Sequence, residues 1–203
     1  MTAPTAESRR EAGRVEAFSD GVMAVIITIT AFELQAPVGH TFHSLYLRLS
    51  HLLVYVLSFV NIGIYWNNHH HLFRATERVN GAVMWANLHL LFWLSLVPVL
   101  TDWVARDYRY HLPASVYGVV VTGAAVAYSI LVRAIVRCNG PDSAVARGIG
   151  SDLKGKLSIA LYVLGIGMAW ISPWIAYGLY VAVAVIWFVP DRRLSRGRIY
   201  SQT

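Results

Sequence analysis

Long apolar runs are the feature of this sequence that most constrains its fold. The run from Gly21 to Phe32 has no charged residue, and neither has the run 157–189. A bilayer core about 30 Å thick takes roughly 20 helical residues. The chain is 56% hydrophobic and 14% charged, whereas soluble domains are about 25% charged. It is therefore predicted to be an all-α membrane protein, with one transmembrane domain over residues 1–203.

Six transmembrane helices are predicted. Four spans follow from the apolar runs, at about 15–34, 49–72, 82–104 and 114–136. The run 157–189 is long for one span. Ser172-Pro173, between Trp170 and Trp174, favours a tight turn with interfacial aromatic residues. The run is therefore divided into spans at about 157–171 and 174–189.

The basic residues support this count. With both termini in the cytoplasm, 14 of the 17 Lys and Arg residues fall on inner segments, in agreement with the positive-inside rule. These are Arg9, Arg10, Arg14, Arg74, Arg78, Arg133, Arg137, Arg147, Lys154, Lys156, Arg192, Arg193, Arg196 and Arg198, while Arg48, Arg106 and Arg109 fall on outer loops. A single helix over 157–189 would put the four C-terminal arginines outside.

The predicted location is the cell inner (plasma) membrane, with several passes through the bilayer. The first residues lack the short apolar core and cleavage site of a signal peptide, so the N-terminus is expected to be a retained cytoplasmic tail. The net charge of +6 follows from this topology, and no nucleic-acid partner is expected.

Neither a metal site nor a cofactor is predicted. The single cysteine, Cys138, excludes an internal disulfide and a thiolate metal cluster. His69, His70 and His71 are consecutive, so on a helix they point about 100° apart and cannot all reach one ion. Metal-ligand pairs on helices usually stand four residues apart.

Proline and glycine residues in the later spans are expected to affect helix shape and packing. Pro98 is expected to kink the third span, because it lacks a backbone N–H. Gly118, Gly123, Gly165 and Gly167 are expected to allow close contacts between helices.

The first span carries a distinctive face. Gly21, Val25, Thr28 and Phe32 fall on one side of a helix, with Ile29 beside them and Glu33 just beyond. If several copies packed around an axis, this face would line a pore. Val25 would then form an apolar ring, Thr28 a ring of hydroxyl oxygens and Glu33 a carboxylate ring that attracts cations. In the alternative interpretation the face contacts lipid or the protein core, and the threonines bond to their own helix.

Asp20 lies at the inner boundary of this span, where an ionisable side chain is costly and usually paired. Arg14 is six residues away, a spacing that does not guarantee a direct pair. A helix-capping role for Ser19 or Asp20 is the alternative, but Arg14 to Phe18 already reads as helix.

The pattern Arg14-x-x-x-Phe18-Ser19-Asp20, followed by Gly21 and an apolar helix that ends near Glu33, resembles the signature of the lysosomal potassium-channel family called transmembrane protein 175. Six spans in about 200 residues, with both ends inside, are similar to its bacterial branch. The resemblance implies a homotetrameric cation channel permeable to potassium (K⁺), with the first helix of each subunit lining a central pore. Apart from permeating K⁺ it implies no cofactor or metal.

The resemblance also implies roles for residues. The constriction of the family lies five residues after the motif aspartate, at Val25, and Thr28 and Phe32 match the next two layers. The family mostly has Ile or Leu at the narrow points. The resemblance therefore does not decide which of these rings is the narrowest. No T-V-G-Y-G-like filter occurs in the chain.

The family ties its motif to polar residues of the next two helices. Here one histidine and Asn87 are expected to face the first helix and bond Ser19, Asp20 or Arg14. His70 or His71 is the predicted histidine.

The main alternative is a secondary cation or proton-coupled transporter that uses Asp20 and the histidines. Transporters often show internal repeats and charges near the midplane. This chain shows no convincing repeat, and its charges lie at the ends of the spans. An enzyme is not expected, since no nucleophile–base set has suitable spacing.

Overall fold

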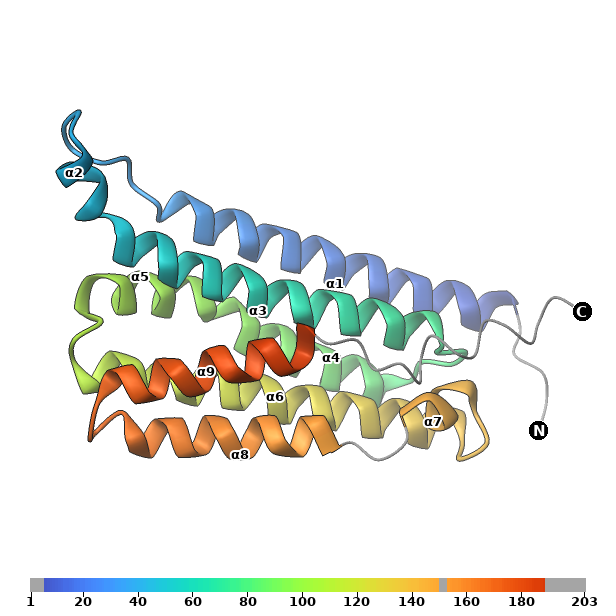
Figure 1. Cartoon of the computed structure of the whole chain (residues 1–203). Helices are drawn as coiled ribbons and strands as arrows, with labels where there is room; N and C mark the ends of the chain where they lie inside the picture. The colour runs from blue at the N-terminus through green and yellow to red at the C-terminus, as the bar shows by residue number, and fades with distance from the viewer. Residues whose placement is uncertain (1–5, 150–152, 189–203) are drawn as a thin grey trace, which may run out of the picture.

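The computed structural model of the chain describes residues 6–149 and 153–188, and all regular structure in them is helical. The long helices run beside one another as a bundle (Figure 1). The helices are α1 (Ala6–Phe32), α2 (Phe42–Tyr46), α3 (Leu49–Arg74), α4 (Gly81–Ser95), α5 (Val97–Asp107), α6 (His111–Asn139), α7 (Ala144–Ile149), α8 (Leu153–Met168) and α9 (Pro173–Phe188). Within the described residues, four segments are long and apolar enough to cross a membrane: α1, α3, α4 with α5, and α6.

The last two helices are shorter, at 16 residues each, or about 24 Å of rise. The chain reverses between them at Ser172-Pro173, where the Ser172 amide donates to the Met168 carbonyl at 2.9 Å. The end of the predicted span 174–189 and the C-terminal arginines Arg192, Arg193, Arg196 and Arg198 lie outside the described residues.

The third span is broken where proline predicted a kink. Helix α4 ends at Ser95, and α5 begins at Val97 with Pro98 in its first turn. Because Pro98 has no N–H, the Leu94 carbonyl loses its usual helical donor. The helix is therefore interrupted next to Pro98, where the sequence predicted a kink.

Helix α6 forms the centre of the bundle and packs against α4, α5, α8 and α9. The buried Tyr180 ring lies where side chains on Gly118 and Gly165 would stand, and the Trp93 ring occupies the corresponding space at Gly123. These three glycines therefore allow the close contacts expected of them. No described atom lies within 4 Å of a side chain built on Gly167, so within the described part of the single chain Gly167 makes no such contact.

Helix α1 lies at the edge of the bundle, against α3, α4 and α5 (Figure 1). One side of it is buried in these contacts, through Ala12, Ser19, Met23, Ile26 and Thr30. These positions recur every three, four or seven residues, as one face of a helix does. The opposite side is exposed, so the chain uses only one side of its first helix for its own packing.

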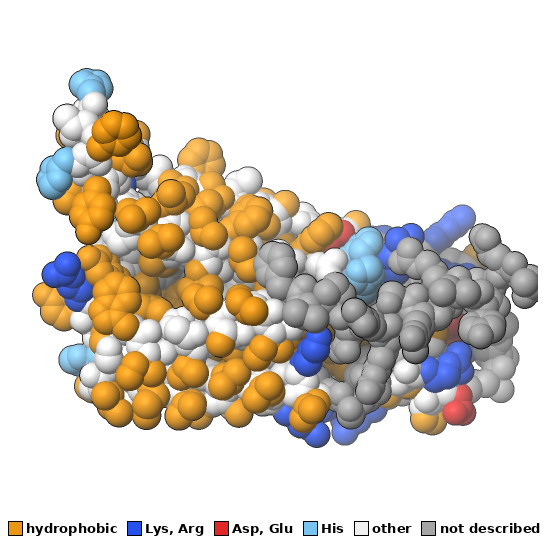
Figure 2. Space-filling view, viewed as in Figure 1, with side chains coloured by type: hydrophobic (Ala, Val, Ile, Leu, Met, Phe, Trp, Pro, Cys, Tyr) orange, Lys and Arg blue, Asp and Glu red, His pale blue; other side chains and the backbone are white. Residues whose placement is uncertain are grey.

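The end of the bundle where α1 begins is held by one amide side chain. The Asn139 Oδ1 atom accepts hydrogen bonds from the backbone N–H groups of Glu77 and Arg78, and its Nδ2 donates to the Arg78 carbonyl. This ties the connection between α3 and α4 to the end of α6. Figure 2 shows apolar side chains along most of the bundle, with Lys and Arg side chains at both ends and most of them at this one.

Candidate functional site

The face predicted from periodicity lies on the outer side of α1. Gly21, Val25, Thr28 and Phe32 are all exposed in the single chain. Val25 is 54% exposed and Phe32 85%. Ile29, beside them, is also exposed at 44%. The chain thus presents a continuous seam of small, apolar and hydroxyl-bearing side chains that it does not cover itself.

Both threonines of α1 bond to their own helix. The Thr30 hydroxyl is buried and donates to the Ile26 carbonyl at 2.7 Å, and the exposed Thr28 hydroxyl donates to the Val25 carbonyl at 2.8 Å. Since each hydroxyl uses its only hydrogen in this bond, the Thr28 oxygen keeps lone pairs free on the exposed seam. Glu33, also exposed, follows directly after the end of α1.

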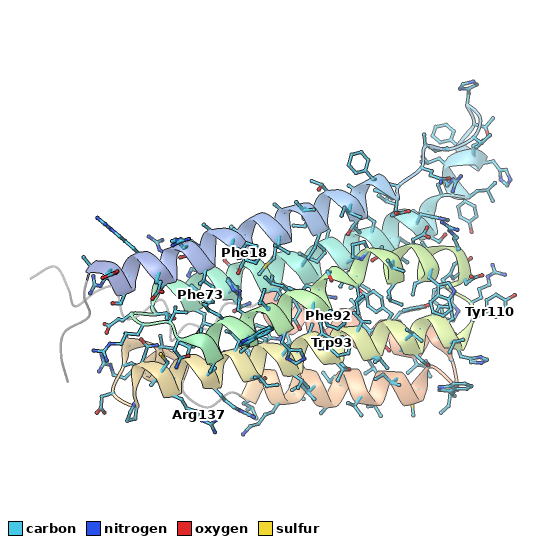
Figure 3. All side chains as sticks on the ribbon, turned by 180° about the vertical axis from the view of Figure 1, so that it is seen from behind. Phe18, Phe73, Phe92, Trp93, Tyr110 and Arg137 are labelled. Carbon is cyan, nitrogen blue, oxygen red and sulfur yellow. The ribbon has the colours of Figure 1, made fainter. Side chains whose placement is uncertain are left out.

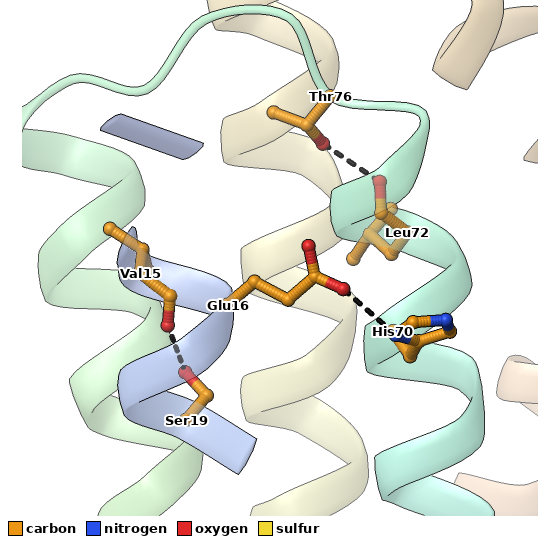
Figure 4. A network of polar contacts seen from close by, with 6 residues as sticks. All are labelled: Val15, Glu16, Ser19, His70, Leu72 and Thr76. Carbon is orange, nitrogen blue, oxygen red and sulfur yellow. Dashed lines mark hydrogen bonds and ion pairs between the residues drawn. The ribbon is translucent and has the colours of Figure 1, made fainter. Parts of the chain in front are cut away.

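A buried chain of hydrogen bonds joins the first helix to the next two. The Asn87 amide donates from Nδ2 to the Ser19 hydroxyl at 2.9 Å. Ser19 in turn donates to the Val15 carbonyl at 2.8 Å, the bond drawn in Figure 4. The Asn87 Oδ1 atom lies 2.8 Å from His69 Nε2. Because an amide oxygen can only accept, His69 carries its hydrogen on Nε2. The order of donation is therefore His69, Asn87, Ser19, Val15, across α3, α4 and α1.

The histidine that takes part in these hydrogen bonds is His69. The prediction named His70 or His71 and was therefore wrong. His69 is fully buried, and its ring stacks on Phe73 with centroids 4.4 Å apart. His71 is exposed. The three side chains point in directions about 100° apart, so only one of them enters the core.

His70 contacts α1 through a residue that the sequence analysis did not name. Its Nδ1 atom lies 2.8 Å from a carboxylate oxygen of Glu16, and the two side chains are 31% and 18% exposed (Figure 4). Asp20, one turn after Glu16, has a buried oxygen, Oδ1, that accepts no hydrogen bond from the described residues. Arg14 is exposed and forms no ion pair with Asp20.

Phe18, the aromatic residue of the motif, is 55% exposed on α1 (Figure 3). It belongs to the uncovered side of the helix rather than to the buried contacts. The motif is thus divided: Ser19 joins the three helices, whereas Arg14 and Phe18 point away from them.

A heptad stripe along α3 could have identified His69 from the sequence. Ser58, Ile62, His69 and Phe73 are buried and stand at intervals of four, seven and four residues, the spacing of one helical face. His70 and His71 fall outside this stripe. Glu16 had no comparable signal, since a carboxylate near a helix start is common.

Comparisons with known proteins cover most of the chain. The family described as Endosomal/lysosomal potassium channel TMEM175 matches residues 14–98. A potassium channel of Chryseobacterium sp. (strain P1-3) is 48% identical over 184 residues, which cover 91% of this chain and 96% of that protein. A potassium channel of Streptomyces collinus is 34% identical, over 80% of this chain and 84% of that protein.

The fold has a counterpart among solved structures. The crystal structure of a lysosomal potassium-selective channel TMEM175 homolog from Chamaesiphon minutus aligns with a TM-score of 0.78 at 27% identity. The alignment covers 91% of this chain and 98% of that one. The matched region of the family includes the motif of α1, helix α4 whose Asn87 bonds Ser19 of the motif, and helix α3 whose His69 bonds Asn87. The chain therefore belongs to the TMEM175 family of potassium channels.

Proposed function

We propose that this chain is a potassium-permeable cation channel in which four copies surround a central pore lined by α1. Each subunit crosses the plasma membrane six times, with both termini in the cytoplasm. The observation that carries the proposal is the exposed seam of α1, which includes Val25, Thr28 and Phe32. The potassium-channel names of the relatives support K⁺ as the permeating ion.

The order of side chains along the seam suits a gated cation path. Rings of Val25, Ile29 and Phe32 would form an apolar constriction, which can close to ions by losing its water. Thr28 lies between these layers and would offer hydroxyl oxygens to a partly dehydrated cation. Glu33, at the far end of the helix, would concentrate cations at the outer mouth.

A secondary cation or proton-coupled transporter is the alternative, and potassium flux distinguishes the two. Tag-free protein in liposomes with an outward K⁺ gradient should release K⁺ without a proton gradient or a second ion. Release that requires a proton gradient would support the transporter and contradict the channel.

The seam is tested by a matched pair of valines. Val25 and Val163 are each 54% exposed, but Val163 lies on α8, away from α1. Val25→Asn should wet the constriction and change K⁺ flux by on the order of tenfold, which corresponds to about 1.4 kcal/mol in the barrier. Val163→Asn, at an exposed position that we expect to face lipid, should leave K⁺ flux per folded protein nearly unchanged. Equal effects of the two variants would contradict a pore along α1.

The number of subunits is tested by single-particle imaging of the purified protein. Four copies with α1 innermost are expected. A monomer, or an assembly in which the seam of α1 faces lipid, would overturn the proposal.

A further inference from the structure

One cluster of side chains on α1 and α3 is not part of the proposed pore lining. It consists of Glu16 and Asp20, one helical turn apart on α1, and His70 on α3. One ligand atom from each, two carboxylate oxygens and an imidazole nitrogen, all lie within 4.8 Å of one another. Two helices thus bring three metal-binding groups together.

We propose that Glu16, Asp20 and His70 bind a divalent transition-metal ion, with Zn²⁺ as the fitting species, in a site that a single chain forms. The inference does not depend on the pore, because all three ligands come from one subunit.

The geometry is close to that of a zinc site. Zinc binds imidazole nitrogen and carboxylate oxygen at about 2.0–2.2 Å, and its tetrahedral ligands lie roughly 3.3 Å apart. The closest pair here, Glu16 Oε1 and His70 Nδ1, is 2.8 Å apart. The remaining separations are at most 4.8 Å, so a carboxylate would need to shift by at most about 1.5 Å to reach the tetrahedral spacing. Two of the ligands stand at i and i+4, the spacing used by helical metal sites.

The charges of the cluster also favour a cation. The two carboxylates together carry two negative charges. Within the described residues, His70 is the only basic side chain in ion-pair range of Glu16, and Asp20 has no ion-pair partner. Asp20 Oδ1 is buried and accepts no hydrogen bond there, although a buried acceptor is normally satisfied. A divalent ion neutralises both carboxylates and supplies the missing partner of Asp20.

The ligand types select the class of metal. Imidazole suits zinc and its transition-metal neighbours, whereas Mg²⁺ and Ca²⁺ prefer all-oxygen sites. Metal binding requires the neutral imidazole, and His70 Nδ1 is buried without a hydrogen-bond partner among the described residues. Three protein ligands leave a fourth position for water. The bound ion ties α1 to α3.

The test is calorimetric titration of the tag-free, detergent-solubilised protein with zinc chloride in the presence of excess Mg²⁺. The wild type should bind one Zn²⁺ per chain. His70→Ala and Asp20→Asn should each weaken binding by at least about 100-fold, since loss of an outer partner of a ligand alone costs 10–100-fold. His71→Ala is the matched control, because His71 is adjacent but exposed, and it should change the affinity less than about threefold.

Thermal unfolding provides a second readout that does not depend on channel activity. Zn²⁺ should raise the Tm of the wild type and of His71→Ala, but not that of Glu16→Gln or Asp20→Asn. Stoichiometric binding that persists in His70→Ala, equal loss in His71→Ala, or a wild-type Tm that does not respond to Zn²⁺ would each overturn the proposal.

Discussion

Replacing Asn87 with leucine tests the buried hydrogen bonds that join α1, α3 and α4. Leucine keeps much of the volume but removes both polar atoms. The Nε2–H group of His69, which is fully buried, then has no acceptor, and the Ser19 hydroxyl loses the donor that reaches it. A buried polar group left unsatisfied costs about 1–3 kcal/mol. Hydrogen bonds inside membrane proteins contribute about 0.6 kcal/mol on average, so the expected total loss of stability is about 2–3 kcal/mol.

Thermal unfolding of the detergent-solubilised protein, followed by tryptophan fluorescence, measures this loss. For a chain of this length 1 kcal/mol lowers Tm by about 2–4 °C, so Asn87→Leu should lower it by about 4–12 °C. Asn67→Leu is the matched control, because Asn67 is exposed on α3. An exposed substitution of this kind should change the stability by less than about 0.5 kcal/mol.

A double-mutant cycle separates the hydrogen bonds from general repacking. Ser19→Ala removes the acceptor of the Asn87 amide, but it should cost less when Asn87 is already leucine. The expected coupling is about 0.6–1.7 kcal/mol. Strict additivity, or an Asn87→Leu shift no larger than that of Asn67→Leu, would refute the assigned bonds.

Two further predictions use matched pairs within one helix. Gly167→Ala should raise Tm, because its new methyl group meets open space and alanine is favoured over glycine in a helix by about 1 kcal/mol. Gly165→Ala should lower Tm, because its methyl group collides with the Tyr180 ring. A rise in Tm for both variants would contradict the packing of α8 on α9. In liposomes, Thr28→Val should reduce the preference for K⁺ over Na⁺ severalfold, because it removes the exposed hydroxyl oxygen. Thr30→Val, at a buried position, should leave this preference unchanged. Identical ion preferences in the two variants would argue against a role for the Thr28 oxygen.

Much of the architecture was predictable because its causes are local. Pro98 breaks the third span where its missing N–H dictates, and the chain turns at Ser172-Pro173. The periodicity of α1 likewise placed Val25, Thr28 and Phe32 on one side of the helix. These features depend on residues close in sequence, and no knowledge of neighbouring helices is needed to find them.

The polar contacts between helices were predicted less well. Asn87 was expected to face the first helix and does contact Ser19, but the histidine that bonds Asn87 is His69 rather than His70 or His71. A step of one residue turns a side chain by about 100°. Which of three adjacent histidines enters the core therefore depends on how α3 is rotated against α1 and α4.

The sequence by itself determined that this chain is a helical membrane protein, where its apolar segments begin and end, and which residues of α1 share a side. Hydropathy and helical period are properties of the chain alone, so they need no packing partner. Only the tertiary structure decided that this side of α1 is left uncovered, that Gly165 but not Gly167 is in close contact, and that Glu16 meets His70. Each of these depends on the rotation and depth of one helix against another, which side-chain packing sets across long separations in sequence.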